Sequence, residues 1–299
     1  MRAVIQDVFQ VVLAVLIPLA SFTTGLQAPR VARGETRLWR RPRQLSRDLL
    51  AVLVLVPLWV IALVLVLPLS PAARGGLLIA TLAVGIGPVA SLKRMGPSTP
   101  AAHEALDLNL IVLLISLAFV PIAVAALAAL FHAEVHISVG AVAKVVLTRA
   151  LLPLLLGLGA ARLWPRFAES AGPRFAKVIN VALVILLVAA IAVTWKQLAT
   201  VSAVAWFACA AAAVGAIVIG HLLGGPEPGA RGVVAAASVM RFPALALAIA
   251  SVTRQGHRLL PMILAYVIAS FVVLAVYGLV MSRRRHETGA RVRMVPRTT

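Results

Sequence analysis

Nine apolar segments of about 20 residues follow one another along this chain, and they restrict its possible folds more than any other feature. Of the 299 residues, 62% are hydrophobic and 12% are charged, whereas a soluble domain averages about 45–50% and about 25%. A transmembrane helix needs about 20 mainly apolar residues. The sequence therefore predicts an all-α integral membrane protein with nine transmembrane helices and no separate soluble domain. The expected spans are residues 7–27, 48–68, 75–94, 105–130, 138–163, 176–194, 199–223, 231–252 and 258–281.

Positive charge lies between these spans and indicates their orientation. The net charge of +19 does not indicate nucleic-acid binding, because the basic residues form short runs between apolar blocks of spanning length. Nine spans place 20 of the 28 Lys and Arg residues on the side of the C-terminus, and cytoplasmic loops carry the excess of these residues. We therefore expect the N-terminus outside, and residues 282–299 as a basic cytoplasmic tail.

The sequence also predicts the location of the protein and its partners. The lipid bilayer is the first expected partner, and no nucleic acid is expected. Because Arg and Ala are abundant and Lys is scarce, we expect a bacterial protein of the plasma (inner) membrane. No catalytic triad, nucleotide-binding or dinucleotide-binding signature occurs, so the sequence predicts no enzyme and no cofactor. The stretch 132-HAEVH-136 departs from the zinc hydrolase motif and is read as a surface loop, so no metal site is expected.

Several expected spans contain proline, but two of them are predicted to be interrupted. Span 75–94 includes the run 85-GIGPVASLKR-94, and span 231–252 includes 240-MRFP-243. If the chain consists of two inverted repeats, of which the first lacks its first helix, both spans are the fourth helix of their repeat. Interrupted helices at matching positions of inverted repeats hold the substrate site in many secondary transporters. Such breaks also leave backbone N–H and C=O groups free at membrane depth.

Several stretches follow the pattern of one family of transporters. The second break, 240-MRFPALALAIA-250, joins Met and Pro at the interruption to small residues and leucines, and 87-GPVASLKR-94 carries Gly, Pro and Ser at the first break. The others are 25-GL-26 at the end of the first span, 41-RP-42 followed by Pro57 in the second, and 151-LLPLLLGLGAARLWP-165 in the fifth. In this order the sequence resembles the bile acid:sodium symporter family.

The resemblance implies an architecture and a function. The family usually has ten helices with both ends inside, so loss of the first gives nine with the N-terminus outside. Residues 1–299 would form a single transporter domain, with a panel of about 7–27 and 138–194 and a core of about 48–130 and 199–281. The two broken helices would cross in the core. The implied function is secondary transport of a small organic anion by alternating access.

The chain departs from the family at the positions that bind sodium in its sodium-coupled members. By resemblance, Ala237 replaces a glutamate ligand, Arg241 a glutamine, Phe242 an asparagine, Val52 a second glutamine and Asp107 a serine. Hard cations prefer oxygen ligands, so transport is expected not to need sodium. H+ and Na+ both remain candidate coupling ions, with Asp107 as the candidate proton carrier. Two alternatives stay open: a transport-inactive sensor or scaffold on the same fold, and a conventional sodium:organic anion symporter.

Arg241 is the central candidate for binding substrate. A charge at membrane depth usually faces a cavity or a partner, and a guanidinium suits carboxylate groups. Each charged candidate also has a competing interpretation without a function in binding. Arg241 could be purely structural or snorkel towards the interface, Asp107 could stabilise a helix N-terminus, and Arg149 could form a structural pair. The complete set of candidate substrate-binding or ion-binding residues is Arg241, Met240, Phe242, Pro243, Pro88, Ser91, Asp107, Arg149 and Ala237.

Overall fold

A computed structural model shows a bundle of long helices. It describes residues 2–27, 42–83, 110–111, 114–115, 119–125, 139–226, 228–251, 253 and 256–293. The helices of this part are α1 (Arg2–Leu26), α3 (Pro42–Leu49), α4 (Val56–Val66), α5 (Pro71–Leu82), α8 (Val139–Val145), α9 (Leu152–Leu163), α10 (Pro165–Leu198), α11 (Ala203–Leu223), α12 (Pro228–Val239), α13 (Pro243–Ser251) and α14 (Gly256–Arg293). Two π-helical turns, η2 (Leu50–Leu55) and η3 (Val146–Leu151), complete the set.

Five helices in the described part of the chain are long and apolar enough to cross a membrane. They correspond to the second, fifth, sixth, seventh and ninth expected spans, and α1 covers the first. The five are Pro42–Val66, Val139–Leu163, Pro165–Leu198, Ala203–Leu223 and Arg258–Arg283. The third and fourth expected spans lie largely outside the described residues, so the count of nine stays a prediction.

Two long spans continue through prolines by means of a π-helical turn. Pro57 is the second residue of α4 and Pro153 is the second residue of α9, and η2 and η3 end immediately before these helices. A proline inside an α-helix removes one hydrogen bond and its ring collides with the carbonyl four residues earlier. The wider π turn moves that carbonyl aside, so residues 42–66 and 139–163 each form one uninterrupted span.

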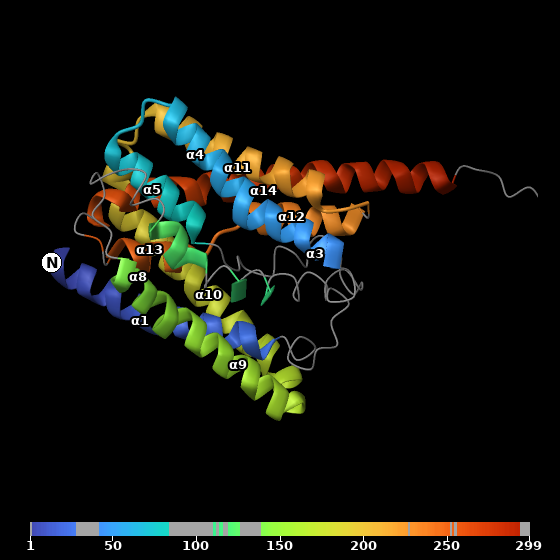
Figure 1. Cartoon of the computed structure of the whole chain (residues 1–299), viewed down its shortest axis with the longest axis horizontal. Coiled ribbons are helices and arrows are strands. Elements are labelled where there is room, and N and C mark those ends of the chain that lie inside the picture. Colours follow the sequence, from blue (N-terminus) through green and yellow to red (C-terminus); the bar gives the residue numbers. More distant parts are fainter. Residues whose placement is uncertain are drawn as a thin grey trace, which may run out of the picture.

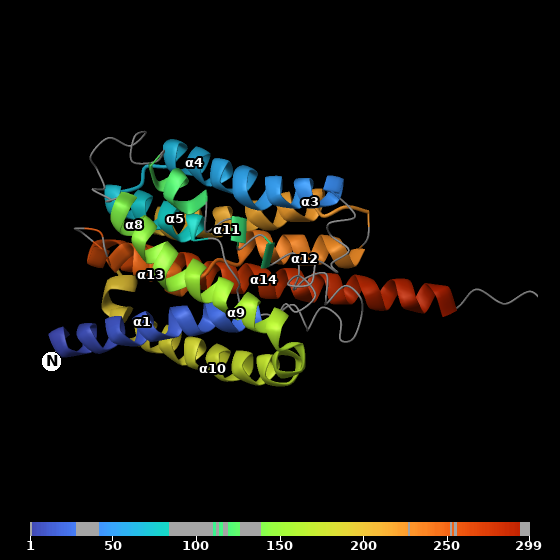
Figure 2. The same cartoon turned by 60° about the horizontal axis from the view of Figure 1, so that its bottom comes forward.

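The helices run along the long axis of the molecule, and the ends of the chain lie at opposite ends of the bundle (Figures 1 and 2). The start of α1, the α4–α5 connection and the α10–α11 turn lie at one end. The α9–α10 turn, the α11–α12 connection and the C-terminal end of α14 lie at the other. This arrangement is the one that an odd number of crossings requires. Which end faces the cytoplasm stays a prediction from the charge distribution.

Two groups of helices pack within the bundle. In the first, α1 lies along α9 and α10, and it approaches α9 closely because Gly25 and Gly157 face the other helix. A Cβ added at Gly157 would overlap the backbone of Phe22, and one at Gly25 would overlap that of Leu154. In the second group, α14 packs against α5, α11 and α13, and α11 packs against α4 and α12. The groups meet where α10 contacts α14 and α1 contacts α13.

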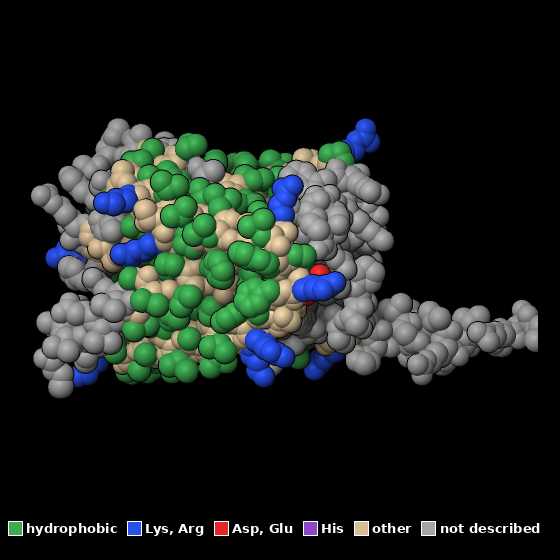
Figure 3. Space-filling view, turned by 90° about the horizontal axis from the view of Figure 1, so that it is seen from below, with side chains coloured by type: hydrophobic (Ala, Val, Ile, Leu, Met, Phe, Trp, Pro, Cys, Tyr) green, Lys and Arg blue, Asp and Glu red, His purple; other side chains and the backbone are tan. Residues whose placement is uncertain are grey.

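The outer surface of the bundle is apolar. Figure 3 shows hydrophobic side chains over the middle of one face, with Lys and Arg towards its ends. On α10, the side chains of Val178, Ile185 and Val188 are each exposed by 60% or more, and their spacing places them on one side of the helix. A large exposed apolar surface of this kind suits contact with lipid rather than water. The chain is therefore a multi-pass membrane protein.

Candidate functional site

The eighth expected span is interrupted in the structure. Helix α12 ends at Val239, α13 begins at Pro243, and residues 240–242 between them are not helical. The Met240 amide still donates to the Ala236 carbonyl at 2.9 Å. Pro243 has no N–H to continue this ladder, but it is well suited to the first position of a new helix. The interruption that the sequence predicts at 240-MRFP-243 is thus present.

The end of α5 contacts this break through the backbone. The Phe242 amide donates to the Ala83 carbonyl at 2.8 Å, and Ala83 follows the last residue of α5 with a non-helical ψ of 60°. A free donor at the break is thereby paired with a free acceptor at a helix end, as buried backbone groups require. The second break therefore touches the third expected span where α5 ends. The rest of that span, from residue 84, lies outside the described residues.

Two further contacts satisfy the backbone of the break. The Tyr266 hydroxyl on α14 donates to the carbonyl of Val239, the last residue of α12, at 3.4 Å. The Phe242 carbonyl accepts from the amides of Leu245 and Ala246 at 3.0 and 3.1 Å, and it thereby starts the ladder of α13. The backbone at residues 239–242 is therefore held from three sides, which fixes the direction of the side chains between the two helices.

Arg241 is buried at this break without a hydrogen-bonding partner. Its side chain is 4% exposed, and Nε, Nη1 and Nη2 make no hydrogen bond with any part of the chain that the structure describes. The Tyr266 hydroxyl interacts electrostatically with the guanidinium but does not meet the geometry of a hydrogen bond to it. An unpaired buried charge costs on the order of several kcal/mol. No described group occupies the donors of Arg241, so an anionic group could bind them.

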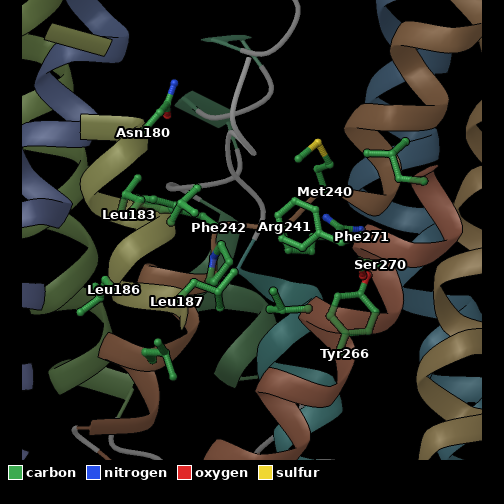
Figure 4. A pocket seen from close by; sticks show the side chains of 15 residues that line it. Asn180, Leu183, Leu186, Leu187, Met240, Arg241, Phe242, Tyr266, Ser270 and Phe271 are labelled. Carbon is green, nitrogen blue, oxygen red and sulfur yellow. The ribbon is translucent and has the colours of Figure 1, made fainter. Parts of the chain in front are cut away.

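Arg241 lines a cavity between α10, the break and α14 (Figure 4). The cavity volume is about 80 Å³, which is room for several water molecules. Most of the lining is aliphatic or aromatic, with four polar side chains among it. The lining residues are Asn180, Leu183, Val184, Leu186, Leu187, Met240, Arg241, Phe242, Pro243, Leu247, Tyr266, Val267, Ser270, Phe271 and Leu274.

A second, more polar cavity lies on the α1 side of Phe242. Its volume is about 40 Å³, and it shares Asn180, Leu183 and Phe242 with the first cavity. Its other polar lining comes from α1, with Ser21, Thr23 and Thr24, and from Gln27 directly after it. Phe242 and Asn180 therefore contribute to both cavities. The break is bordered by an apolar cavity beside α14 and a hydroxyl-rich one beside α1.

The predicted site residues fall into three groups. Met240, Arg241, Phe242 and Pro243 lie together and line the first cavity. Ala237 lies one turn earlier on α12 and Arg149 lies half-buried in η3, and neither lines either of the two cavities. Pro88, Ser91 and Asp107 lie outside the described residues. The expected pair between Arg241 and Asp107 therefore stays a prediction.

Three polar residues of the cavity are missing from the sequence-based set. Asn180 is a single amide within an apolar span, and Tyr266 and Ser270 are four residues apart on α14, so they share one face. The Ser270 hydroxyl is buried and makes no hydrogen bond within the described part of the chain. A search for isolated polar residues inside the spans, at helical spacing, would have found all three.

Comparison with known proteins supports the reading of the fold. A search of curated proteins finds no match to this chain. The family model described as the sodium bile acid symporter family matches residues 33–201, which is more than half of the 299 residues. The match includes the first predicted break, and it confirms the resemblance seen in the sequence. The chain belongs to the sodium bile acid symporter family.

Proposed function

We propose that this protein is a secondary transporter that moves a small organic anion by alternating access, without sodium coupling. Membership of a symporter family supports transport as the activity. The observation that carries the proposal is the buried guanidinium of Arg241 in a cavity at the helix break, where no described residue forms a hydrogen bond with it. A fixed positive charge at this place attracts an anion and repels a cation.

Different residues of the cavity can bind different parts of such an anion. The planar guanidinium of Arg241 can hold a carboxylate or sulfonate through two parallel hydrogen bonds. Ser270 and Asn180 can bind further polar groups, and the leucines of α10 with Phe271 can cover an apolar body. This pattern, a mainly apolar pocket with a few convergent polar groups, is typical of sites for small molecules. It favours an amphipathic organic anion over an inorganic one.

The residues at the break argue against a sodium ion there. Ala237 and Val52 supply no side-chain oxygen, and Val52 is fully buried in an apolar cluster. The guanidinium of Arg241 would repel a sodium ion bound close to it, because like charges interact unfavourably over a few ångströms at low dielectric. We therefore propose that Arg241 takes the electrostatic role that the ion has in sodium-coupled relatives.

The packing of the helices suggests how access alternates. The first cavity lies where α10, of the group formed by α1, α9 and α10, meets α13 and α14 of the other group. We propose that these groups correspond to the panel and the core expected from the family. A rocking movement of one group against the other would open the cavity to either side in turn, as in other transporters with a site at such an interface.

Binding to the purified protein tests this proposal. Radiolabelled taurocholate, cholate, succinate and pyruvate would be tested in sodium buffer and in choline buffer. We expect saturable binding of at least one anion in both buffers, loss of that binding in Arg241→Ala, and poor recovery in Arg241→Lys because a point charge lacks the bidentate fork. Arg166→Ala, an exposed arginine on α10, is the matched control.

Uptake into proteoliposomes then separates transport from mere binding. Uptake and counterflow of the bound anion would establish the transporter. Binding that is intact in Arg241→Ala would contradict the fixed-charge site. Binding of an anion without any uptake or counterflow would instead favour a sensor or scaffold on the same fold.

A further inference from the structure

Asp48 is a buried acid that the proposed anion site does not use. It lies on α3, its side chain is 1% exposed, and it is the one buried acidic residue in the part of the chain that the structure describes. Neither Oδ1 nor Oδ2 accepts a hydrogen bond from any described group. Because α3, η2 and α4 form one span from Pro42 to Val66, this carboxyl belongs to a transmembrane helix.

A buried apolar cluster lies on the same helix face as Asp48 in the described part of the chain. Leu45 and Val52, three residues before and four residues after it, lie on the same face of the helix and belong to a buried apolar cluster. That cluster also includes Ile111 and Val234 of α12, with Ile219 and Leu223 of α11 packed against it. A carboxylate on this face would be surrounded by groups that cannot solvate its charge.

No basic group in the described part of the chain forms an ion pair that would neutralise the negative charge of an ionised Asp48. The basic residues on the elements packed around it are Arg43 and Arg47 on α3, His221 on α11 and Arg231 on α12. None of them forms an ion pair with Asp48. Arg231 donates from Nε to the Gly225 carbonyl at 2.6 Å, and the His221 ring lies 2.8 Å from the Tyr277 hydroxyl. Both are therefore engaged with other groups.

We propose that Asp48 is a proton-binding site, that its carboxyl carries a proton in this conformation, and that exchange of this proton is coupled to transport. An ionised carboxylate without partners is strongly disfavoured in apolar surroundings, and a group in this position becomes neutral instead. A bound metal cation is less suitable, because it needs several oxygen ligands and the cluster supplies none. The coupling part of the proposal rests on the proposed transport function.

The position of Asp48 connects it to the helix break. Eight residues separate Asp48 from Val56, which corresponds to roughly 12 Å along a helix. Val56 packs in one cluster with Met240 and Val239 at the end of α12. A shift of α12 that accompanies binding at Arg241 would therefore also move the α3–α4 span, through this packing. The π-helical turn η2 begins two residues after Asp48, and such turns are frequent at functional sites.

Infrared spectroscopy of the protein in proteoliposomes tests the proton site without any substrate. We expect the difference between wild type and Asp48→Asn to contain the C=O absorption of a protonated carboxyl. Above the midpoint of its titration, this signal should fall about tenfold per pH unit, as for a single ionising group. Asn is neutral and similar in shape to the protonated acid, so this variant should fold, and Glu169→Gln on the exposed surface of α10 is the control. If Asp48 loses its proton at about pH 4, like an ordinary exposed aspartate, the proposal is overturned.

Uptake of taurocholate, whose sulfonate stays ionised, tests the coupling. In wild-type proteoliposomes an inside-alkaline pH gradient should drive accumulation. Asp48→Asn should keep counterflow, which needs no net proton movement, and should lose the response to the gradient. If Asp48→Asn responds to the gradient like wild type, the coupling role is wrong. If wild type takes up none of the tested anions, the transport proposal fails, whereas the infrared titration still decides whether Asp48 binds a proton.

Discussion

Replacing Arg241 with Met should stabilise the protein while removing anion binding. Arg241 is 4% exposed and its three nitrogens make no hydrogen bond within the described part of the chain, so among the described groups the substitution breaks only the interaction with the Tyr266 hydroxyl. Met is unbranched and of similar length, and it can fill the space beside Phe271 and Leu274. Replacement of buried charges by apolar residues of similar volume has stabilised other proteins by about 1–4 kcal/mol. We expect a gain within that range.

The expected loss of affinity can be estimated from the same geometry. Two charge-assisted hydrogen bonds from the guanidinium to an anion contribute about 1.5–3 kcal/mol each. Their loss should raise the Kd by roughly a hundredfold to ten-thousandfold, at about 1.4 kcal/mol per factor of ten. Stability would be measured by unfolding in mixed micelles, and binding by titration with the anion identified for wild type.

The sign of the stability change decides the interpretation. If Arg241→Met lowers the free energy of unfolding by about 3–5 kcal/mol, the value expected when one partner of a buried ion pair is removed, then Arg241 has a structural partner. Such a partner would have to lie outside the described residues, and Asp107 would be the first candidate to test. Arg241→Lys, which keeps the charge, separates an effect of charge from an effect of shape.

Three further predictions test the topology, the coupling and the packing. A reporter fused after Thr299 should be cytoplasmic and one at the N-terminus external, and finding both on one side would contradict the nine-span arrangement. Replacing sodium with choline at fixed pH should leave uptake unchanged in wild type, whereas a new sodium requirement in Arg241→Gln would support the view that the guanidinium replaces an ion. Gly157→Ala should destabilise the protein by about 1–3 kcal/mol through overpacking against Phe22. In the control Gly159→Ala, the added Cβ meets no atom within 4 Å, so stability should change by less than about 1 kcal/mol. Equal effects of the two substitutions in an unfolding assay would refute the close α1–α9 contact.

The spans and the second break could be predicted because both depend on local sequence. An apolar run of about 20 residues predicts a transmembrane helix, and Pro243 predicts an interruption because it lacks an N–H. The ends of the helices are less predictable. Helix α10 begins at Pro165 instead of near residue 176, and α14 continues to Arg293, into the expected tail. Helices can extend beyond the apolar part of a span, and hydropathy does not detect that extension.

The contacts between distant helices could not be predicted from the sequence. Asn180 and Tyr266 become site residues only because α10 and α14 pack on either side of Arg241, a matter of tertiary geometry. The sequence did not indicate Asp48 as a site residue for a different reason. It follows a basic segment at the first residue of an expected span, where an acid looks like a solvated boundary residue, and its burial depends on tertiary packing, which the local sequence does not show.

The hydrogen bond from the Phe242 amide to the Ala83 carbonyl has a consequence for how this site can be studied and how it can change. Because both atoms belong to the main chain, alanine scanning of either residue leaves the bond intact, and its contribution would be seen only on replacing the amide with an ester at residue 242. The same property makes the joint between the two segments independent of side-chain identity. Arg, Gln or Ala at the neighbouring position 241 would leave both atoms of this bond in place, so the side chains at the break can vary while the contact between the two segments stays the same.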